Sequence, residues 1–439
     1  MTERREFLKA AGVAAVYTLS SDAAPPLNTR IGPNDQIGLG FIGIGIRGTQ
    51  LMNEFSPQPG VRLVAAADVY DGHLTRGREL TNGRMETTRR YEEVLNRKDV
   101  DAIVIATPDH WHKRMTLEAL AAGKHVYIEK PLTWNIKEGP EIIAAEKNSG
   151  RLLMVGSGGK TSALAQKAKE LMAANAIGKV SQIRMVNHRN SREGAWLYPI
   201  PPDASPETID WARFQGSAPK RSFSPEVFFR WRCWWEYSGG VATDLFVHML
   251  TTLHEVMQVQ APHTVVSQGG LWFWKDGRTV PDVMHSVFEY PQGFLAELTV
   301  NLKNSAPAPG MIIYGSEGTL VWNRDKIVIT GEPEDKDIQF YSSIAWPKVM
   351  REEYLKAKGV DPANPRGMWS NRPQPSEFKV ERGPGHTEYF IRSLREGTPS
   401  REPAIEGHAA AGAAHLANAA YRQGRRMRWD FTANKITAI

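Results

Sequence analysis

Three glycines in one short stretch are suited to bringing a phosphate group close to the backbone. They lie in Gly43-Ile44-Gly45-Ile46-Arg47-Gly48, directly after the apolar run 36–42. Gly43 permits a tight turn, Gly45 removes a side chain that would block phosphates, and Gly48 lets a helix and a strand pack closely. This spacing predicts that a dinucleotide pyrophosphate binds at a helix N-terminus.

A carboxylate stands where a dinucleotide site requires one. The second apolar run, 61–67, ends on Asp68, which lies 20 residues beyond Gly48. A carboxylate at the tip of the second strand can accept hydrogen bonds from the hydroxyls of the adenosine ribose, so Asp68 favours NAD over NADP. A glycine-rich turn alone is also typical of an ordinary loop, but here the strand, the helix, the next strand and the acidic residue all accompany it.

Two further signatures follow predicted strands of the same region. Thr107-Pro108-Asp109-His110-Trp111-His112 comes after the run 101–106, and Glu129-Lys130-Pro131 comes after 124–128. Open α/β sheets bind ligands at the carboxyl ends of their strands. The proline biases Lys130 toward an extended backbone, from which its ammonium group can donate to a substrate hydroxyl and to the cofactor ribose. The predicted cofactor contacts are Gly43, Gly45, Ile46, Arg47, Gly48, Asp68, Thr107, Pro108, His110, His112, Glu129 and Lys130.

Asp244 and His248 form a candidate acid–base pair. They lie four residues apart in the predicted helix 240–257, so both side chains project from one face. A histidine beside a carboxylate has the features of a general base. A buried capping pair at Asp244 and His248, with Lys130 as a solvated surface lysine, is the alternative.

Other polar and aromatic residues are weaker candidates. We interpret Trp231, Trp234 and Trp235 as core residues in preference to a sugar-stacking surface. The stretch 188–192 could hold an acidic substrate group, but an exposed polar loop is favoured. His254-Glu255 lacks the second histidine of a zinc-binding helix motif, so we predict no metal site.

The elements that must position these residues indicate two domains. Strands and helices alternate up to residue 156, which predicts a doubly wound parallel sheet with helices at 113–122 and 136–149. Farther along, β-branched runs with hairpin-length connections between 264 and 329 predict an α+β domain with a large, open, mostly antiparallel sheet. Helices are expected at 166–176, 387–395 and 406–423. The proline-rich segment 332–384 is either an active-site flap or an oligomer contact.

Composition narrows the classes of function. A chain of 439 residues fits two domains, and a net charge of +6 without basic blocks interleaved with aromatics does not indicate nucleic acid. The arginines of 422–428 are expected at a helix C-terminus. A single cysteine, Cys233, excludes an intrachain disulfide.

The N-terminal residues resemble a twin-arginine export signal. Arg4-Arg5 precedes Phe7-Leu8-Lys9, a short apolar run and small residues ending at Ala24. An amphipathic N-terminal helix is the alternative. The expected division is a signal peptide over 1–24, a linker over 25–35, an NAD(P)-binding Rossmann domain over 36–156 and a substrate-binding and oligomerisation domain over 157–439. No other run approaches the roughly 20 residues that span a membrane, so a soluble periplasmic protein is expected.

The four motifs together resemble the glucose–fructose oxidoreductase, inositol dehydrogenase and rhizopine-catabolism family (Gfo/Idh/MocA). The resemblance covers most of the chain beyond the leader and includes Glu406-Gly407-His408. It implies a Rossmann domain, a second domain with an open sheet, a carbohydrate substrate and a homo-oligomer built through that sheet. It also implies that His248 takes a proton from a sugar hydroxyl, that Lys130 polarises this hydroxyl, and that Asp244 binds substrate or orients the base.

Three functions remain open at this point. The first is an NAD(P)-dependent oxidoreductase that acts on a sugar, polyol or sugar derivative and retains its cofactor, because an exported enzyme could not exchange NADH. The second is an NAD-dependent glycosidase, lyase or epimerase that oxidises and re-reduces its substrate. The third, disfavoured by the intact set of Lys130, Asp244 and His248, is a non-catalytic sugar-binding protein.

Overall fold

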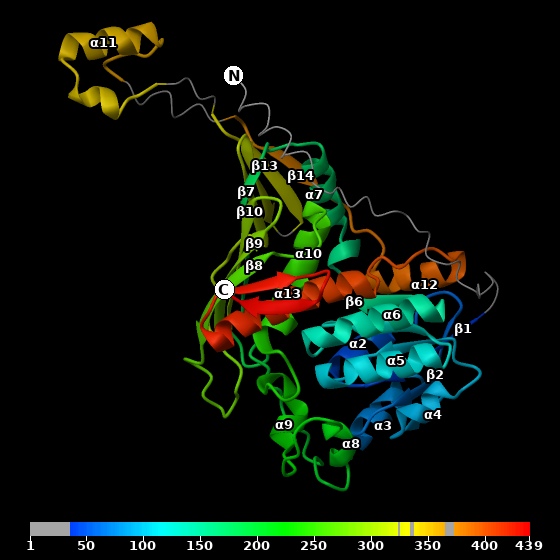
Figure 1. Cartoon of the computed structure of the whole chain (residues 1–439). Helices are drawn as coiled ribbons and strands as arrows, with labels where there is room; N and C mark the ends of the chain where they lie inside the picture. Colours follow the sequence, from blue (N-terminus) through cyan, green and yellow to red (C-terminus); the bar gives the residue numbers. More distant parts are fainter. Residues whose placement is uncertain (1–35, 324, 334–337, 365–372) are drawn as a thin grey trace.

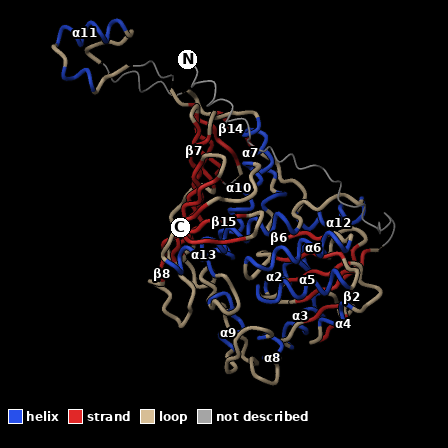
Figure 2. Tube along the Cα trace, viewed as in Figure 1, coloured by secondary structure: helices blue, strands red, loops and turns tan. Residues whose placement is uncertain are grey.

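The computed structural model describes residues 36–323, 325–333, 338–364 and 373–439, and its strands form two separate sheets (Figure 2). The predicted signal peptide and linker lie outside the described residues. In the first sheet all six strands are parallel, in the order β3-β2-β1-β4-β5-β6. Their bounds are β1 Ile37–Ile42, β2 Val61–Ala67, β3 Glu86–Thr88, β4 Ala102–Ile105, β5 His125–Glu129 and β6 Leu153–Gly156.

Helices cover both faces of this parallel sheet, which confirms the doubly wound Rossmann prediction (Figure 1). They are α2 Ile46–Phe55, α3 Asp71–Leu80, α4 Tyr91–Leu95, α5 His112–Ala121 and α6 Gly139–Ser149. Because both faces are covered, β1, β4 and β5 consist entirely of buried residues. The chain order reverses between β1 and β4, so a crevice opens at their carboxyl ends.

The second sheet has ten strands in the order β14-β13-β12-β11-β7-β10-β9-β8-β15-β16. Only the pair β7–β10 is parallel, so the prediction of a large, mostly antiparallel sheet is confirmed. The strands are β7 Val180–His188, β8 Thr264–Gly270, β9 Val283–Tyr290, β10 Phe294–Asn301, β11 Met311–Gly315, β12 Gly318–Asn323, β13 Lys326–Gly331, β14 Ser376–Lys379, β15 Met427–Asp430 and β16 Lys435–Ala438.

Three helices pack on one face of the ten-stranded sheet (Figure 1). They are α7 Ala163–Ala173, α10 Val247–Met257 and α13 Ala404–Gln423. The alternating burial along β9 and β10 places one set of side chains against these helices and leaves the other set half-buried or exposed. Helix α10, which carries His248, therefore lies between the sheet and the Rossmann domain, with α7 and α13 packed beside it.

Segments from the second half of the chain also pack on the Rossmann domain. Helix α12 (His386–Glu396) contributes Phe390 to the same core as Phe55 and Tyr127. The short helices α8 (Trp211–Gln215) and α9 (Pro225–Phe229) approach its other end, where Phe228 contacts Tyr70. The boundary after residue 156 stays a prediction, since these contacts tie both halves together.

Two expectations about local structure are wrong or incomplete. Helix α13 ends at Gln423, and Arg428 lies in strand β15, so the arginines of 422–428 do not share a helix end. The segment 332–384 contributes β14 to the sheet and contains helix α11 (Lys348–Ala357). Figure 1 shows α11 apart from both domains, and the choice between flap and oligomer contact stays open. None of the described helices has the length and apolarity that crossing a membrane requires.

Candidate active site

The glycine turn after β1 borders a cavity of about 310 Å³. Gly43 has φ of +91°, and a Cβ there would lie 2.6 Å from the carbonyl oxygen of Ala106. A Cβ on Gly48 would lie 2.1 Å from the carbonyl oxygen of Gly43, which explains why helix α2 can begin so close to β1. A Cβ on Gly45 would meet only His73, at 3.6 Å, so this position opens into the cavity. These three environments fit a dinucleotide cradle.

Asp68 lies at the end of β2 and lines the same cavity. Its carboxylate accepts from the backbone N–H groups of Ile44 (2.7 Å) and Tyr70 (3.0 Å) and lies 3.1 Å from Nδ1 of His73. Burial alone would raise the pKa of Asp68, but the charge and hydrogen bond of His73 lower it below its usual value. The group is therefore an ionised acceptor, as binding of ribose hydroxyls requires. His73 belongs to no sequence motif and was not predicted.

The two strand-end signatures occupy different positions. Thr107 and Pro108 line the first cavity, as do Ile46 and Arg47. Glu129 and Lys130 line a second cavity of about 780 Å³, which Ile46, Arg47 and Thr107 also border. Arg47 joins the motifs, since its Nε donates to the Glu129 carboxylate at 2.7 Å.

His110 and His112 line neither cavity. His110 is buried with Nε2 at 2.9 Å from the carbonyl of Phe214, and His112 contacts the carbonyls of Pro131 (2.6 Å) and Thr107 (3.0 Å). Burial lowers the pKa of both to about 4. The structure thus places these two predicted cofactor contacts behind the crevice, where His112 ties together the loops that carry the other motif residues.

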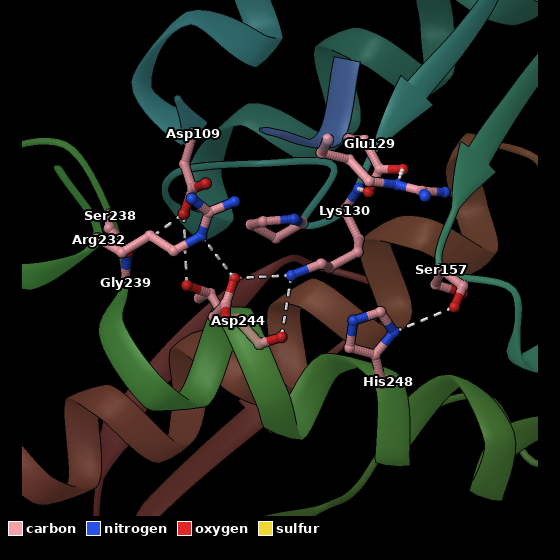
Figure 3. A network of polar contacts seen from close by, with 12 residues as sticks. Asp109, Glu129, Lys130, Ser157, Arg232, Ser238, Gly239, Asp244 and His248 are labelled. Atoms are coloured by element: carbon pink, nitrogen blue, oxygen red, sulfur yellow. Dashed lines mark hydrogen bonds and ion pairs between the residues drawn. The ribbon is translucent and has the colours of Figure 1, made fainter. Parts of the chain in front are cut away.

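Lys130 and Asp244 meet in the second cavity (Figure 3). Nζ of Lys130 donates to Oδ1 of Asp244 at 2.8 Å and to its backbone carbonyl at 3.0 Å. Nε of Arg232 donates to the same Oδ1 at 3.1 Å. Burial would raise the pKa of Asp244, but the charges of Lys130 and Arg232 outweigh it and hold the pKa well below its usual range. One ionised carboxylate thus fixes two cations.

His248 lines the same cavity from the start of α10. Its Nδ1 lies 3.0 Å from the carbonyl oxygen of Ser157. Because a carbonyl only accepts, Nδ1 carries the hydrogen and Nε2 keeps its lone pair. Burial, with the charge of Lys130, lowers the pKa of His248 to about 4. The ring is therefore neutral at pH 7 and able to accept a proton.

A π-helical turn, Ala242–Phe246, precedes α10 and carries Asp244. Gly240 enters this turn with φ of +60°, and a Cβ there would lie 2.9 Å from the side chain of Val280. π-Helical turns are often found at functional sites. Here the turn directs Asp244 toward Lys130 while His248, on the following helix, faces Ser157 (Figure 3).

Asp109, for which no role was predicted, is a further carboxyl beside this network. Its Oδ2 accepts from the backbone of Gly239 and the hydroxyl of Thr243, both at 3.4 Å (Figure 3). Burial raises the pKa of Asp109 to about 7, against the charges of Lys130 and Arg232. Asp109 therefore links the Rossmann domain to the loop that begins the π-helical turn.

Three other residues of the site were not among the predicted site residues. Arg232 and Trp231 line both cavities, with the Arg232 guanidinium 4.2 Å from the centre of the Trp231 ring. Trp234 is buried in the core as predicted, and Trp231 and Trp235 are partly buried and pack against that core, with Trp231 also lining the cavities. Arg189 lines the second cavity, so the stretch 188–192 is more than an exposed loop. Among the described residues, no group of histidine, cysteine and acidic side chains is arranged to hold a metal ion.

Several known proteins are similar to this chain over part of its length. A glycosyl hydrolase family 109 protein of Shewanella pealeana is 31% identical over 35% of this chain, and a second from Shewanella sp. (strain ANA-3) is 35% identical over 31%. The chain spans 39% and 35% of the lengths of these relatives.

Solved structures share the two-domain fold. Aldose-aldose oxidoreductase from Caulobacter crescentus superposes with a TM-score of 0.63 at 17% identity, covering 90% of this chain and 99% of the other. Levoglucosan dehydrogenase in complex with NADH and levoglucosan gives a TM-score of 0.62 at 18% identity, with the same coverage of both chains.

Two family models match the two domains in turn. Residues 37–157 match the oxidoreductase family with an NAD-binding Rossmann fold, and residues 212–321 match the GFO/IDH/MocA C-terminal domain. Together the two models span more than half of the chain, and the glycine cradle with Asp68 fits the cofactor that the first one names. The chain therefore belongs to the Gfo/Idh/MocA family of NAD-dependent oxidoreductases.

Proposed function

We propose that this protein oxidises a hydroxyl group of a sugar, polyol or sugar derivative. The observation that carries the proposal is that Lys130, Asp244 and His248 converge on one cavity, which Ile46 and Arg47 of the glycine motif also line. The relatives support a carbohydrate substrate, since levoglucosan dehydrogenase and aldose-aldose oxidoreductase share the fold.

The side chains of the second cavity have separable tasks. Two of the three N–H groups of Lys130 are donated to Asp244, which leaves the third for the oxygen of a substrate hydroxyl. His248 accepts the hydroxyl proton at Nε2, because Nδ1 is held by the Ser157 carbonyl. NAD bound at the cradle supplies the hydride acceptor, so that the C–H and O–H bonds of the substrate break as its C=O bond forms. Asp244 holds Lys130 in place.

Export by the twin-arginine route remains part of this proposal. Its support is the motif at Arg4-Arg5, and an exported enzyme would have to keep its nucleotide and reoxidise it in place. A second candidate function follows from the same requirement: an NAD-dependent glycosidase, lyase or epimerase that reduces its intermediate again. The similarity to glycosyl hydrolase family 109 proteins favours this candidate.

One experiment separates these functions. The protein is purified, its bound nucleotide is released and counted by mass spectrometry and absorbance, and sugars, sugar pairs and glycosides are then screened for products. An oxidised sugar indicates net oxidation, whereas a hydrolysed or epimerised sugar of unchanged oxidation state supports the second candidate.

The variant His248→Asn should retain the nucleotide and lose turnover by about 10²-fold or more. Surviving turnover would show that His248 is not the base.

We also propose that the protein is a homo-oligomer built through the open face of the ten-stranded sheet. Val266 and Leu295 lie on that face, and each is 45% exposed. Their neighbours Val265 and Ala296 point to the opposite, buried face, which the helices cover. Light scattering on the purified protein tests this proposal, and a monomer would contradict it.

A further inference from the structure

The second cavity contains a cation that forms no ion pair with any described carboxylate. Four cationic side chains line this cavity: Arg47, Lys130, Arg189 and Arg232. The first is paired with Glu129 at 2.7 Å, and the second and fourth share Asp244. Within the described residues, no ion pair joins Arg189 to an acidic side chain, and its Nε donates to the amide oxygen of Asn187 at 3.3 Å.

The position of Arg189 is fixed by its surroundings. It directly follows strand β7, and its backbone N–H donates to the carbonyl oxygen of Asn301 at 2.9 Å. Its aliphatic stem lies against Gly194, where a Cβ would come within 3.0 Å of the Cβ of Arg189. Asn190 and Ser191 follow it along the cavity wall and offer an amide and a hydroxyl group.

The charge of Arg189 reaches the reacting groups. Burial and the charge of Lys130 are the main causes of the low pKa of His248, and Arg189 acts in the same direction. Arg189 also helps to lower the pKa of Asp244, after Lys130 and Arg232. Arg189 therefore lines the same cavity as His248 and Lys130, within range for its charge to act on His248 and on Asp244.

One acidic side chain, Glu193, also belongs to the wall of the second cavity. It is exposed and lies beyond ion-pair distance of Arg189. An exposed carboxylate is well solvated and neutralises a cation inside a cleft only weakly. An arginine left without a partner in a cleft favours an anionic ligand, and its planar fork matches a carboxylate in two parallel hydrogen bonds.

We propose that the substrate of the second cavity is a sugar acid whose carboxylate is bound by Arg189, while Lys130 and His248 contact the reacting hydroxyl. This inference rests on the proposed function, because it names the substrate class of the same site. Arg189 acts as the specificity-determining residue, and the carboxylate itself takes no part in the oxidation.

The test uses pairs of sugars that differ only in the group at carbon 6. The nucleotide-loaded protein is titrated with D-glucose and D-glucuronate, D-galactose and D-galacturonate, and D-mannose and D-mannuronate, and Kd is measured by calorimetry. Reduction of the bound nucleotide is followed separately at 340 nm. The variants are Arg189→Leu, Arg189→Lys and, as a matched control, Arg192→Leu, which changes an arginine of the same loop that does not line the cavity.

We expect at least one acid to bind tenfold or more tightly than its neutral partner. Arg189→Leu should remove this preference with little change for the neutral sugar, Arg189→Lys should retain part of it, and Arg192→Leu should leave it intact. The inference is overturned if no acid binds, if each neutral sugar binds as well as its acid, or if Arg189→Leu releases the nucleotide.

The two proposals can fail separately. Reduction of the nucleotide by neutral sugars, independent of Arg189, would retain the proposed function and refute the sugar-acid inference. Arg189-dependent binding of an acid that leaves the nucleotide and the sugar unchanged would retain the inference about binding and refute the oxidoreductase function.

Discussion

The protonation state of His248 determines how the reaction depends on pH. An unperturbed histidine has a pKa near 6.5 and would lose half of its capacity as a base at that pH. Burial and Lys130 lower the pKa of His248 to about 4, so the ring stays neutral as the pH falls from 8 to 6. We expect kcat/KM for reduction of the bound nucleotide to show no inflection near pH 6.5. Because the pKa of Asp109 is about 7, an inflection of kcat/KM near pH 7 that disappears in the variant Asp109→Asn would arise from Asp109. An inflection that persists in this variant would contradict the prediction for His248.

Two glycines of the cradle, Gly45 and Gly43, should respond differently to a methyl group. At Gly45 the added Cβ meets only His73 at 3.6 Å, so Gly45→Ala should fold with an unchanged Tm. The same Cβ projects into the nucleotide cavity, and we expect nucleotide affinity to fall tenfold or more. Gly43→Ala should lose both stability and nucleotide, because its φ is positive and the Ala106 carbonyl is 2.6 Å away. Calorimetric titration with NAD and thermal melts measure both effects, and full nucleotide content in Gly45→Ala would refute the assignment.

Residues in short-range patterns were predictable from the sequence, and those paired across the chain were not. Gly43 to Gly48 form a local motif, and the i, i+4 spacing of Asp244 and His248 is visible in the sequence. The bond between His248 and Ser157 joins residues 91 apart, and the network of Lys130 with Asp244 spans 114 positions. Arg189, Trp231 and Arg232 lie in stretches without periodicity, so only the fold brings them to the cavity.

At the scale of elements, the π-helical turn depends on the backbone at Gly240. An alanine there adopts an unfavourable positive φ of 60° and also contacts Val280 at 2.9 Å. Gly424 has nearly the same φ, 61°, but no neighbour within 4 Å. We expect Gly424→Ala to cost about 1–2 kcal/mol and leave activity intact. Gly240→Ala should cost more and lower kcat, because the turn that carries Asp244 shifts. Equal effects of the two variants on kcat would contradict this role.

Long elements were easier to predict than short ones. Strands β1 and β4 are uninterrupted apolar runs and β5 is apolar at its three central positions, a pattern typical of strands buried in a parallel sheet. The short elements β3 and α4, of three and five residues, have too few positions to show a period and were not predicted. Strand β15 follows α13 after Gly424, which has a left-handed backbone conformation. The arginines of 422–428 lie on both sides of this change from helix to strand, although all of them were predicted to lie at the helix end.

At the scale of the whole molecule, burial of ionisable side chains determines how the fold responds to acid. Five buried histidines have a pKa lowered chiefly by burial to about 4 or, for one of them, about 3: His110, His112, His125, His408 and His254. Each binds a proton near pH 6.5 in the unfolded chain and not in the folded one. Their contribution is therefore complete above pH 6.5 and declines as the pH falls toward 4, by about 3 kcal/mol per histidine.

Two buried carboxyls act in the opposite direction. Burial raises the pKa of Asp109 to about 7 and that of Glu402 to about 8, so their protonated forms stabilise the fold as the pH decreases. They offset only part of the loss from the histidines, which are more numerous. We therefore expect cooperative unfolding with a midpoint between about pH 4 and 6, measured by circular dichroism and tryptophan fluorescence. A native signal retained below pH 4 would contradict the prediction. Replacing the buried His125 by Gln should move the midpoint to lower pH, provided that the variant is folded at pH 7.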